Sequence, residues 1–241
     1  DRTKSRGLGD VYKRQILEDK TINAFAAPGG IIGINLGMFL NTEREGELAS
    51  VMCHELAHLS QRHFARSQNR NSPLANALMI LGSIAVAAAS RNPEAILIAP
   101  AAMQQMSINY TRSNEKEADR IGFNNLVKAG FDPNDMTMMF QRMQDKYQNE
   151  DSEQFSYLMT HPLPSERLTD MRIRADGIKN NSKNSYRDNL DFYLMQKRAQ
   201  VWAEKDIKEL VKRFKRNLKS QNENTEVSNR YGPVSYTHLT L

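Results

Sequence analysis

The chain has 241 residues, of which 39% are hydrophobic and 25% are charged, and its formal net charge at pH 7 is +5. Residues 1–15 alone carry five basic and two acidic side chains, so the rest of the chain has the balanced charge of a soluble domain and no pattern that indicates a nucleic-acid partner. A single cysteine, Cys53, excludes an internal disulfide. The length suits one medium-sized domain with a smaller appendage.

Both ends of the chain read as foreign sequence. GLGDVYKRQ near the start and VSYTHLTL at the end resemble translated sequencing-adapter sequence, so we expect residues 1–15 and 234–241 to be non-native tails. On this interpretation the natural segment is a fragment that runs from about Ile16 to about Pro233, and any signal peptide lies outside it.

The first predicted elements are a β-hairpin and a helix. TINAFA and IIGINL, residues 21–26 and 31–36, are strand-like runs separated by the turn sequence APGG. Thr42 and Glu45 then stand three residues apart, as in a capping box, and apolar residues recur at helical spacing after them. The predicted helix carries VMCHELAHLSQRH, residues 51–63.

Two Ala-rich runs follow, residues 74–90 and 94–103, separated by RNP. A membrane-spanning helix needs about 20 mostly apolar residues, whereas the first run is shorter and contains Asn76. We therefore expect residues 74–105 to form a pair of helices that pack on the protein or contact a membrane surface, and a true span is the less favoured alternative.

A further helix is predicted within residues 106–133, with Gly130 and Pro133 as its stop signals. The methionines between residues 136 and 143 are expected to fill core or interface space.

The polar segment GIKNNSKNSYRDN, residues 177–189, predicts a linker to a second unit. Helices are predicted over Leu190–Glu204 and Asp206–Lys219, followed by a segment that ends in an aromatic residue and Gly. A helix pair of this size resembles the first unit of a tetratricopeptide-type array, and one unit cannot bury its own apolar face. The predicted organisation is a main domain over 16–178 and a truncated helical pair over 186–233.

The strongest chemical signal is the His-Glu-x-x-His pattern at residues 54–58. His54 and His58 are four residues apart, so on a helix both can face one ion, and Glu55 can reach a water on that ion. Zinc lowers the pKa of a bound water, whose proton a neighbouring glutamate can accept. The same pattern also arises by chance on surface helices, but such a helix would have no third ligand.

A third ligand is available in SNEKEADRIG, residues 113–122. Catalytic zinc is held by three protein ligands and keeps one open position. Glu115 and Asp119 share one face of the predicted helix, so Glu115 can be that ligand and Asp119 can accept a hydrogen bond from a ligand imidazole.

Other residues near these motifs receive plainer interpretations. Glu117 points away from the Glu115 face and is expected to be solvated. His63 has no partner at ligand spacing and is expected on a helix surface, while Cys53 is expected in the core. The metzincin pattern is excluded because Gln61 and Phe64 stand where it requires Gly and His.

HELAH and NEKEAD, with NAFAAPGG before them and THPLPSERL after them, resemble the gluzincin family that contains the CAAX prenyl protease and the heat-shock protease HtpX. With the C-terminal helix pair, they are most similar to its branch of periplasmic β-barrel assembly-enhancing proteases, which carry a C-terminal tetratricopeptide domain. The resemblance covers roughly residues 16–232. It implies an α+β, mostly α, zincin-type metalloprotease domain with a small β-sheet, followed by the start of a tetratricopeptide-like repeat.

The resemblance also implies roles for individual residues. One Zn²⁺ per chain is held by three ligands: His54, His58 and Glu115. Glu55 is the general base. An edge strand binds an extended peptide by backbone pairing, and its substrate-binding residues are Asn23, Ala24 and Phe25.

Two further residues come from the THPLPSERL motif. His161 matches a family histidine near the metal, which either stabilises the oxyanion of the tetrahedral intermediate or occupies the open zinc position in a resting state. Without the resemblance, His161 reads as an ordinary loop histidine. Arg167 is expected to anchor this loop through a carboxylate.

The implied activity is zinc-dependent hydrolysis of peptide bonds in the periplasm of a Gram-negative bacterium. The implied substrates are misassembled outer-membrane proteins, with the barrel-assembly machinery as a candidate partner. Residues 74–105 separate the two metal-binding segments, so they are either a gating, membrane-contacting element or a plain helical hairpin. Two alternatives stay open: a chaperone or assembly factor with a largely latent zinc site, against which Glu55 argues, and a membrane-integrated protease.

Overall fold

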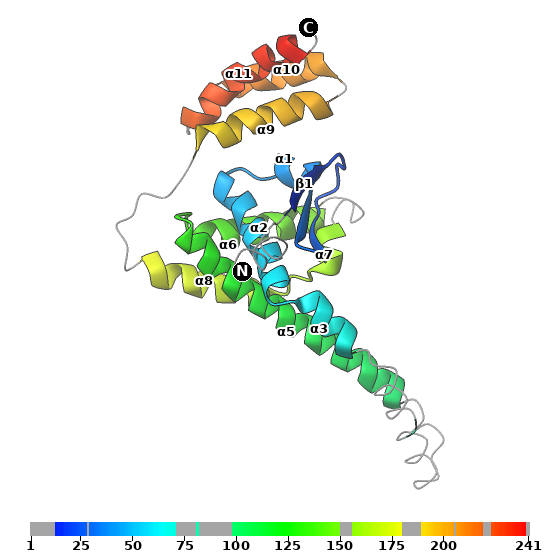
Figure 1. Cartoon of the computed structure of the whole chain (residues 1–241). Helices are drawn as coiled ribbons and strands as arrows, with labels where there is room; N and C mark the ends of the chain where they lie inside the picture. The colour runs from blue at the N-terminus through cyan, green and yellow to red at the C-terminus, as the bar shows by residue number, and fades with distance from the viewer. Residues whose placement is uncertain are drawn as a thin grey trace, which may run out of the picture.

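The computed structural model describes residues 13–27, 29–70, 81, 98–149, 156–179, 189–204, 206–218 and 223–239. In these residues the fold is mostly helical with one small sheet, as predicted (Figure 1). The main body contains the sheet and the described helices α1, α2, α3 and α5 to α8, and a second group of helices, α9 to α11, lies beyond it toward the C-terminus.

The sheet has three strands, β1 (Lys13–Leu17), β2 (Ala24–Ala27) and β3 (Ile31–Asn35). β3 is central, antiparallel to β2 and parallel to β1. The predicted hairpin is therefore confirmed, and Gly29 and Gly30 close its turn with φ of 86° and 78°, values that favour glycine. β1 was not predicted, and it begins within the segment expected to be foreign; the limits of both tails stay predictions.

Three helices follow the sheet: α1 (Leu36–Leu40), α2 (Glu45–Ser60) and α3 (His63–Arg70). The predicted capping box is wrong. The Thr42 hydroxyl donates to the Phe39 carbonyl at 2.8 Å and not to the first turn of α2. Instead, the Glu47 carboxylate reaches back to accept from the Glu43 amide at 2.6 Å, so the residue that caps the start of the helix lies two positions later than expected.

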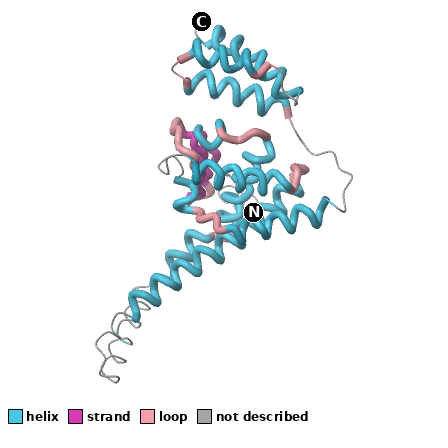
Figure 2. The backbone as a smooth tube through the Cα atoms, turned by 180° about the vertical axis from the view of Figure 1, so that it is seen from behind, coloured by secondary structure: helices cyan, strands magenta, loops and turns pink. Residues whose placement is uncertain are grey.

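Helix α5 (Ile98–Lys128) joins the end of the second Ala-rich run to the next predicted helix in one continuous element. The first Ala-rich run, residues 74–90, lies outside the described residues except for residue 81. α3 and the first half of α5 run side by side away from the main body, as both views show (Figures 1 and 2). Within the described parts of the chain, none of the helices combines the length and apolar character that a bilayer crossing requires.

α2 passes through the centre of the main core, between the sheet, α5 and α6 (Asn134–Asn149). Three of the four methionines of α6 are core residues, as predicted: Met136, Met139 and Met143 are buried, whereas Met138 is exposed. Two further helices follow, the short α7 (Ser156–Thr160) and the longer α8 (Ser165–Lys179). α8 extends through Gly177 to Lys179, so the first three residues of the predicted linker are helical instead, and residues 180–188 of that prediction lie outside the described residues.

The C-terminal group consists of α9 (Leu190–Ala203), α10 (Ile207–Arg216) and α11 (Glu223–Leu239). The first two match the predicted helices, whereas α11 continues through the expected break after Gly232. α9 packs on α1, where the Phe192 and Phe39 rings meet edge to face at 5.5 Å. The Gln196 side chain also donates to the Phe39 and Thr42 carbonyls. The tetratricopeptide-like nature of this group stays a prediction.

Candidate metal centre

The candidate site is built where α2 and α5 pack closely together. Gly122 makes this possible, because a Cβ at that position would lie 3.0 Å from the His54 amide nitrogen. One and two turns before Gly122 on the same face of α5 stand Asp119 and Glu115. The close packing of the two backbones therefore brings both carboxylates to the histidine face of α2.

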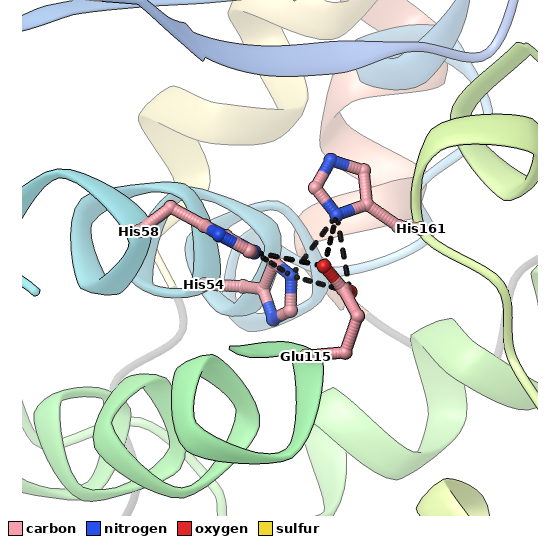
Figure 3. A group of neighbouring side chains, drawn as sticks. All are labelled: His54, His58, Glu115 and His161. Atoms are coloured by element: carbon pink, nitrogen blue, oxygen red, sulfur yellow. Dashed lines mark hydrogen bonds and ion pairs between the residues drawn. The ribbon is translucent and has the colours of Figure 1, made fainter. Parts of the chain in front are cut away.

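Four side chains from three segments converge on one point (Figure 3). The Nε2 atoms of His54 and His58 are 2.9 Å apart. Glu115 Oε2 lies 3.3 Å from His54 Nε2, and Glu115 Oε1 lies 3.2 Å from His58 Nε2. His161, which follows α7, points its Nδ1 at the same place, 3.1 Å from each Glu115 oxygen. The four candidate ligand atoms all lie within 4.8 Å of one another.

The contacts on the far side of each ring suit a cluster that binds a cation. His54 Nδ1 lies 3.0 Å from Asp119 Oδ1, and a His54 ring whose only proton is on Nδ1 presents a lone pair at Nε2. His58 Nδ1 likewise contacts another acceptor, the Nδ1 of His63, at 2.8 Å. Two lone pairs and a carboxylate then face one another, an arrangement that a metal ion stabilises.

The electrostatics of the buried groups favour the same conclusion. Burial opposes a charged His54, but hydrogen bonds to Asp119 and Glu115 outweigh it and raise the pKa of His54 to about 10. Burial also works against the Glu115 carboxylate, yet hydrogen bonds from the three histidines hold its pKa far below the usual range. The cluster thus keeps the Glu115 carboxylate ionised in the protein interior, and a positive charge between the four side chains would stabilise it.

Arg167 connects the two carboxylates of the site to the loop that carries His161. Its guanidinium donates to both Asp119 oxygens at 2.7 Å, a bidentate pair. The same side chain donates to the Pro162 carbonyl at 2.5 Å and lies 3.0 Å from Glu115. Arg167 thus links the loop of His161 to the carboxylate that orients His54.

Glu55 lies next to the cluster with its carboxylate buried. Among the described residues, neither of its oxygens has a hydrogen-bond partner, and His161 Nε2 lies 3.6 Å from Glu55 Oε1. A buried acceptor without a donor is costly, so this position is suited to a group that gains a proton from a ligand at the site.

His63 differs from the sequence interpretation, and its partner is the partly exposed Glu117. His63 is buried, with only 4% of its surface exposed, and its Nε2 lies 3.0 Å from Glu117 Oε2. Burial lowers the pKa of His63, although Glu117 opposes the shift. α2 ends at Ser60 and Arg62 adopts a positive φ of 53°, so the chain turns and brings His63 back onto His58. A helix-spacing argument cannot detect this turn.

A cavity of about 340 Å³ opens beside the cluster. The side chains of Asn23 and Phe25 line it together with Glu55, His58, Glu115 and His161. Ala24 instead faces the main core and is fully buried, so only its backbone is available on this side. Cys53 packs against the core as predicted, and burial raises the pKa of its thiol to about 11.

Comparison with known proteins places these residues in a family context. Residues 4–175 match Peptidase family M48. The chain is 49% identical over 165 residues to the putative beta-barrel assembly-enhancing protease of Vibrio cholerae serotype O1, which covers 66% of this chain and 34% of the relative. It is 40% identical over 193 residues to the beta-barrel assembly-enhancing protease of Escherichia coli O157:H7, covering 76% and 38% respectively.

A more distant relative is the mitochondrial metalloendopeptidase OMA1 of Schizosaccharomyces pombe, 29% identical over 163 residues that make up 67% of this chain and 46% of the relative. The matched region thus spans little more than a third of the length of the bacterial relatives.

Proposed function

The chain belongs to peptidase family M48 and is a metalloprotease, and from this premise we propose that it is a zinc-dependent endopeptidase with Glu55 as its general base. One observation carries the proposal: two imidazole lone pairs and the Glu115 carboxylate converge beside a buried Glu55 that has no hydrogen-bond donor among the described residues. The proposed ligands of one Zn²⁺ are His54, His58 and Glu115.

Each side chain then has a defined task. When bound, zinc acts as a Lewis acid that polarises a carbonyl and acidifies water. Glu55 accepts the proton of the attacking water and later delivers it to the leaving amine. Asp119 and Arg167 fix the ring of His54, since a ligand histidine keeps its orientation only if its other nitrogen is held.

We propose that the substrate is an extended polypeptide that pairs with β2. β2 is one of the two edge strands of the described sheet, and Asn23 and Phe25 line the cavity that holds Glu55. A free strand edge can add a peptide through main-chain hydrogen bonds, so affinity comes from the backbone at Asn23, Ala24 and Phe25. Such binding accepts many sequences, provided that the segment is unfolded.

His161 gives the site a resting state. Its Nδ1 points into the cluster, at 3.1 Å from Glu115, and its ring stacks on buried Tyr157 with centroids 4.5 Å apart. Of the two roles that the sequence left open, this geometry favours His161 as an additional ligand that occupies the open metal position. A site closed in this way must release His161 before it can cleave.

The names of the bacterial relatives support an envelope role. We propose that the protein acts in the periplasm on misassembled outer-membrane proteins, with the barrel-assembly machinery as a partner, and that the α9–α11 group is the start of a tetratricopeptide-like docking domain. The geometry of His161 also favours the second candidate function, a chaperone or assembly factor whose zinc site is mostly latent.

The test compares zinc content and casein cleavage for the wild type and for Glu55→Gln, both purified without chelator. The matched control is Glu166→Gln, which alters an exposed carboxylate in the first turn of α8, just after the loop of His161. We expect all three proteins to bind one zinc and only Glu55→Gln to lose activity, by about 10²–10⁴-fold.

Zinc binding without cleavage by the wild type would favour the latent site, and His161→Ala should then release activity. A wild type that binds no zinc would overturn the proposal.

A further inference from the structure

A second chain of polar contacts leads away from the metal cluster, on the side opposite Asp119. His58 Nδ1 lies 2.8 Å from His63 Nδ1, His63 Nε2 lies 3.0 Å from Glu117 Oε2, and that oxygen accepts from Arg66 at 2.6 Å. The mechanism proposed above uses none of His63, Arg66 and Glu117.

The assignment of His58 as a metal ligand determines where the protons lie along this chain. His58 presents Nε2 to the cluster, and a ring that binds a metal through Nε2 carries its only proton on Nδ1. His63 must then accept at Nδ1, and its own proton is on Nε2, where it donates to Glu117. Each contact has one donor and one acceptor, and the chain ends on a carboxylate that Arg66 holds in place.

The two candidate histidine ligands are thus supported in parallel ways. His54 Nδ1 lies 3.0 Å from Asp119 Oδ1, and both Asp119 oxygens accept from Arg167. His58 is linked to the Glu117 carboxylate and to Arg66 through the imidazole of His63. The ligand His54 is supported within the core, whereas the support of His58 ends at half-exposed side chains on α3 and α5.

We propose that His63 is a positioning residue for the metal ligand His58, and that Glu117 and Arg66 fix the tautomer of His63 that this role requires. The proposal rests on the proposed function only for the assignment of His58 as a ligand. His63 fixes the ring orientation and the Nδ1–H tautomer of His58, because an imidazole held at one nitrogen presents the other to the metal in a defined direction.

The backbone supports this role. The turn at Arg62 has a positive φ, which is costly for a residue with a side chain, and it places the first residue of α3 against the last turn of α2. The result is that His63 is buried although it begins a helix whose next three residues are exposed. The chain therefore adopts a strained turn at the position that brings His63 to His58.

The first test reads the tautomers directly in the wild-type, zinc-loaded chain labelled with ¹⁵N-histidine. The expected result in long-range ¹H–¹⁵N spectra is that His63 is neutral with its proton on Nε2, and that His58 is protonated on Nδ1. A His63 ring with its proton on Nδ1, or a doubly protonated ring, would overturn the proposal irrespective of activity.

The second test measures zinc affinity by competition with a chromophoric chelator. His63→Leu removes the acceptor at similar volume, and we expect affinity to fall by about 10–100-fold. His63→Asn can place its carbonyl oxygen near the position of Nδ1, so it should stay within a few-fold of the wild type. Glu117→Ala should lie between the two, and Glu166→Ala, on an exposed carboxylate, should match the wild type.

The outcomes separate the two proposals. A wild type without zinc defeats the proposed function, whereas a zinc-binding wild type with an equal affinity in His63→Leu defeats only the positioning role. If His63→Leu does not fold, the comparison of His63→Asn with Glu117→Ala and the tautomer assignment still decide it; equal loss in both variants would contradict the proposal.

Discussion

Asp135 offers a test of buried electrostatics far from the metal cluster. Its side chain is fully buried against the first turn of α2, so close to Gly46 that a Cβ there would lie 1.7 Å from Asp135 Oδ2. Arg44 lies 3.2 Å from Oδ1. Burial raises the pKa of Asp135 from 3.8 to about 7, with Arg44 opposing the shift. The neutral form is therefore favoured in the folded protein below about pH 7.

The sign follows from the two pKa values. Below about pH 4, Asp135 is protonated in both the folded and the unfolded states and its ionisation contributes nothing. As the pH rises from 4 to 7, the unfolded chain ionises first, so the folded state loses stability. Because one pKa unit corresponds to about 1.36 kcal/mol, the shift predicts a loss of about 2 kcal/mol between pH 5 and pH 7.

Asp135→Asn removes the ionisation at nearly constant volume. We expect the free energy of unfolding of the variant, relative to that of the wild type, to increase by about 2 kcal/mol from pH 5 to pH 7. Urea denaturation at several pH values measures it, and titrations common to both proteins cancel in the difference. Asp176→Asn, on an exposed carboxylate, is the control. A difference that does not change with pH would refute the reasoning.

Three other predictions concern the cluster itself. Gly122→Ala should push α5 away from α2 and lower zinc affinity with little loss of helix, as measured by chelator competition and circular dichroism. Arg167→Met should destabilise the fold by about 3–5 kcal/mol in urea denaturation, because it leaves buried Asp119 without its bidentate partner. Removal of zinc with a chelator should lower the thermal midpoint, since zinc binds the folded state; Glu55→Gln should show the same decrease, because Glu55 is not a proposed ligand.

The sequence predicts the parts of the site that lie on regular elements. His54 and His58 are four apart on one helix, and Glu115 and Asp119 are four apart on another, so helical periodicity places each pair on one face. The hairpin was predictable for a similar reason, because two strand-like runs enclose a glycine turn. In each case the signal is local.

The structural features that the sequence did not predict are those that depend on contacts between residues distant in sequence. The residues adjacent to β1 in sequence carry no signal that it pairs in parallel with β3. The Thr42 hydroxyl finds the Phe39 carbonyl because α1 intervenes before α2, and α11 continues through Gly232, whose lack of a side chain admits the Phe214 ring of α10. Propensity and capping rules describe one element at a time, and these positions are decided by contacts between elements.

His63 makes the physical limit of periodicity clear. Five residues after His58, it would point away from that residue on a continuous helix, and the sequence argument therefore placed it in solvent. The turn at Arg62 ends α2 and resets the direction of the chain, so the same spacing brings His63 into contact with His58 Nδ1. The position of a residue just past the end of a helix that carries candidate ligands should therefore be assessed from the turn that follows, and not from the helical period. A ligand histidine needs a contact at its second ring nitrogen. The segment that folds back after the helix is the nearest part of the chain that can supply this contact.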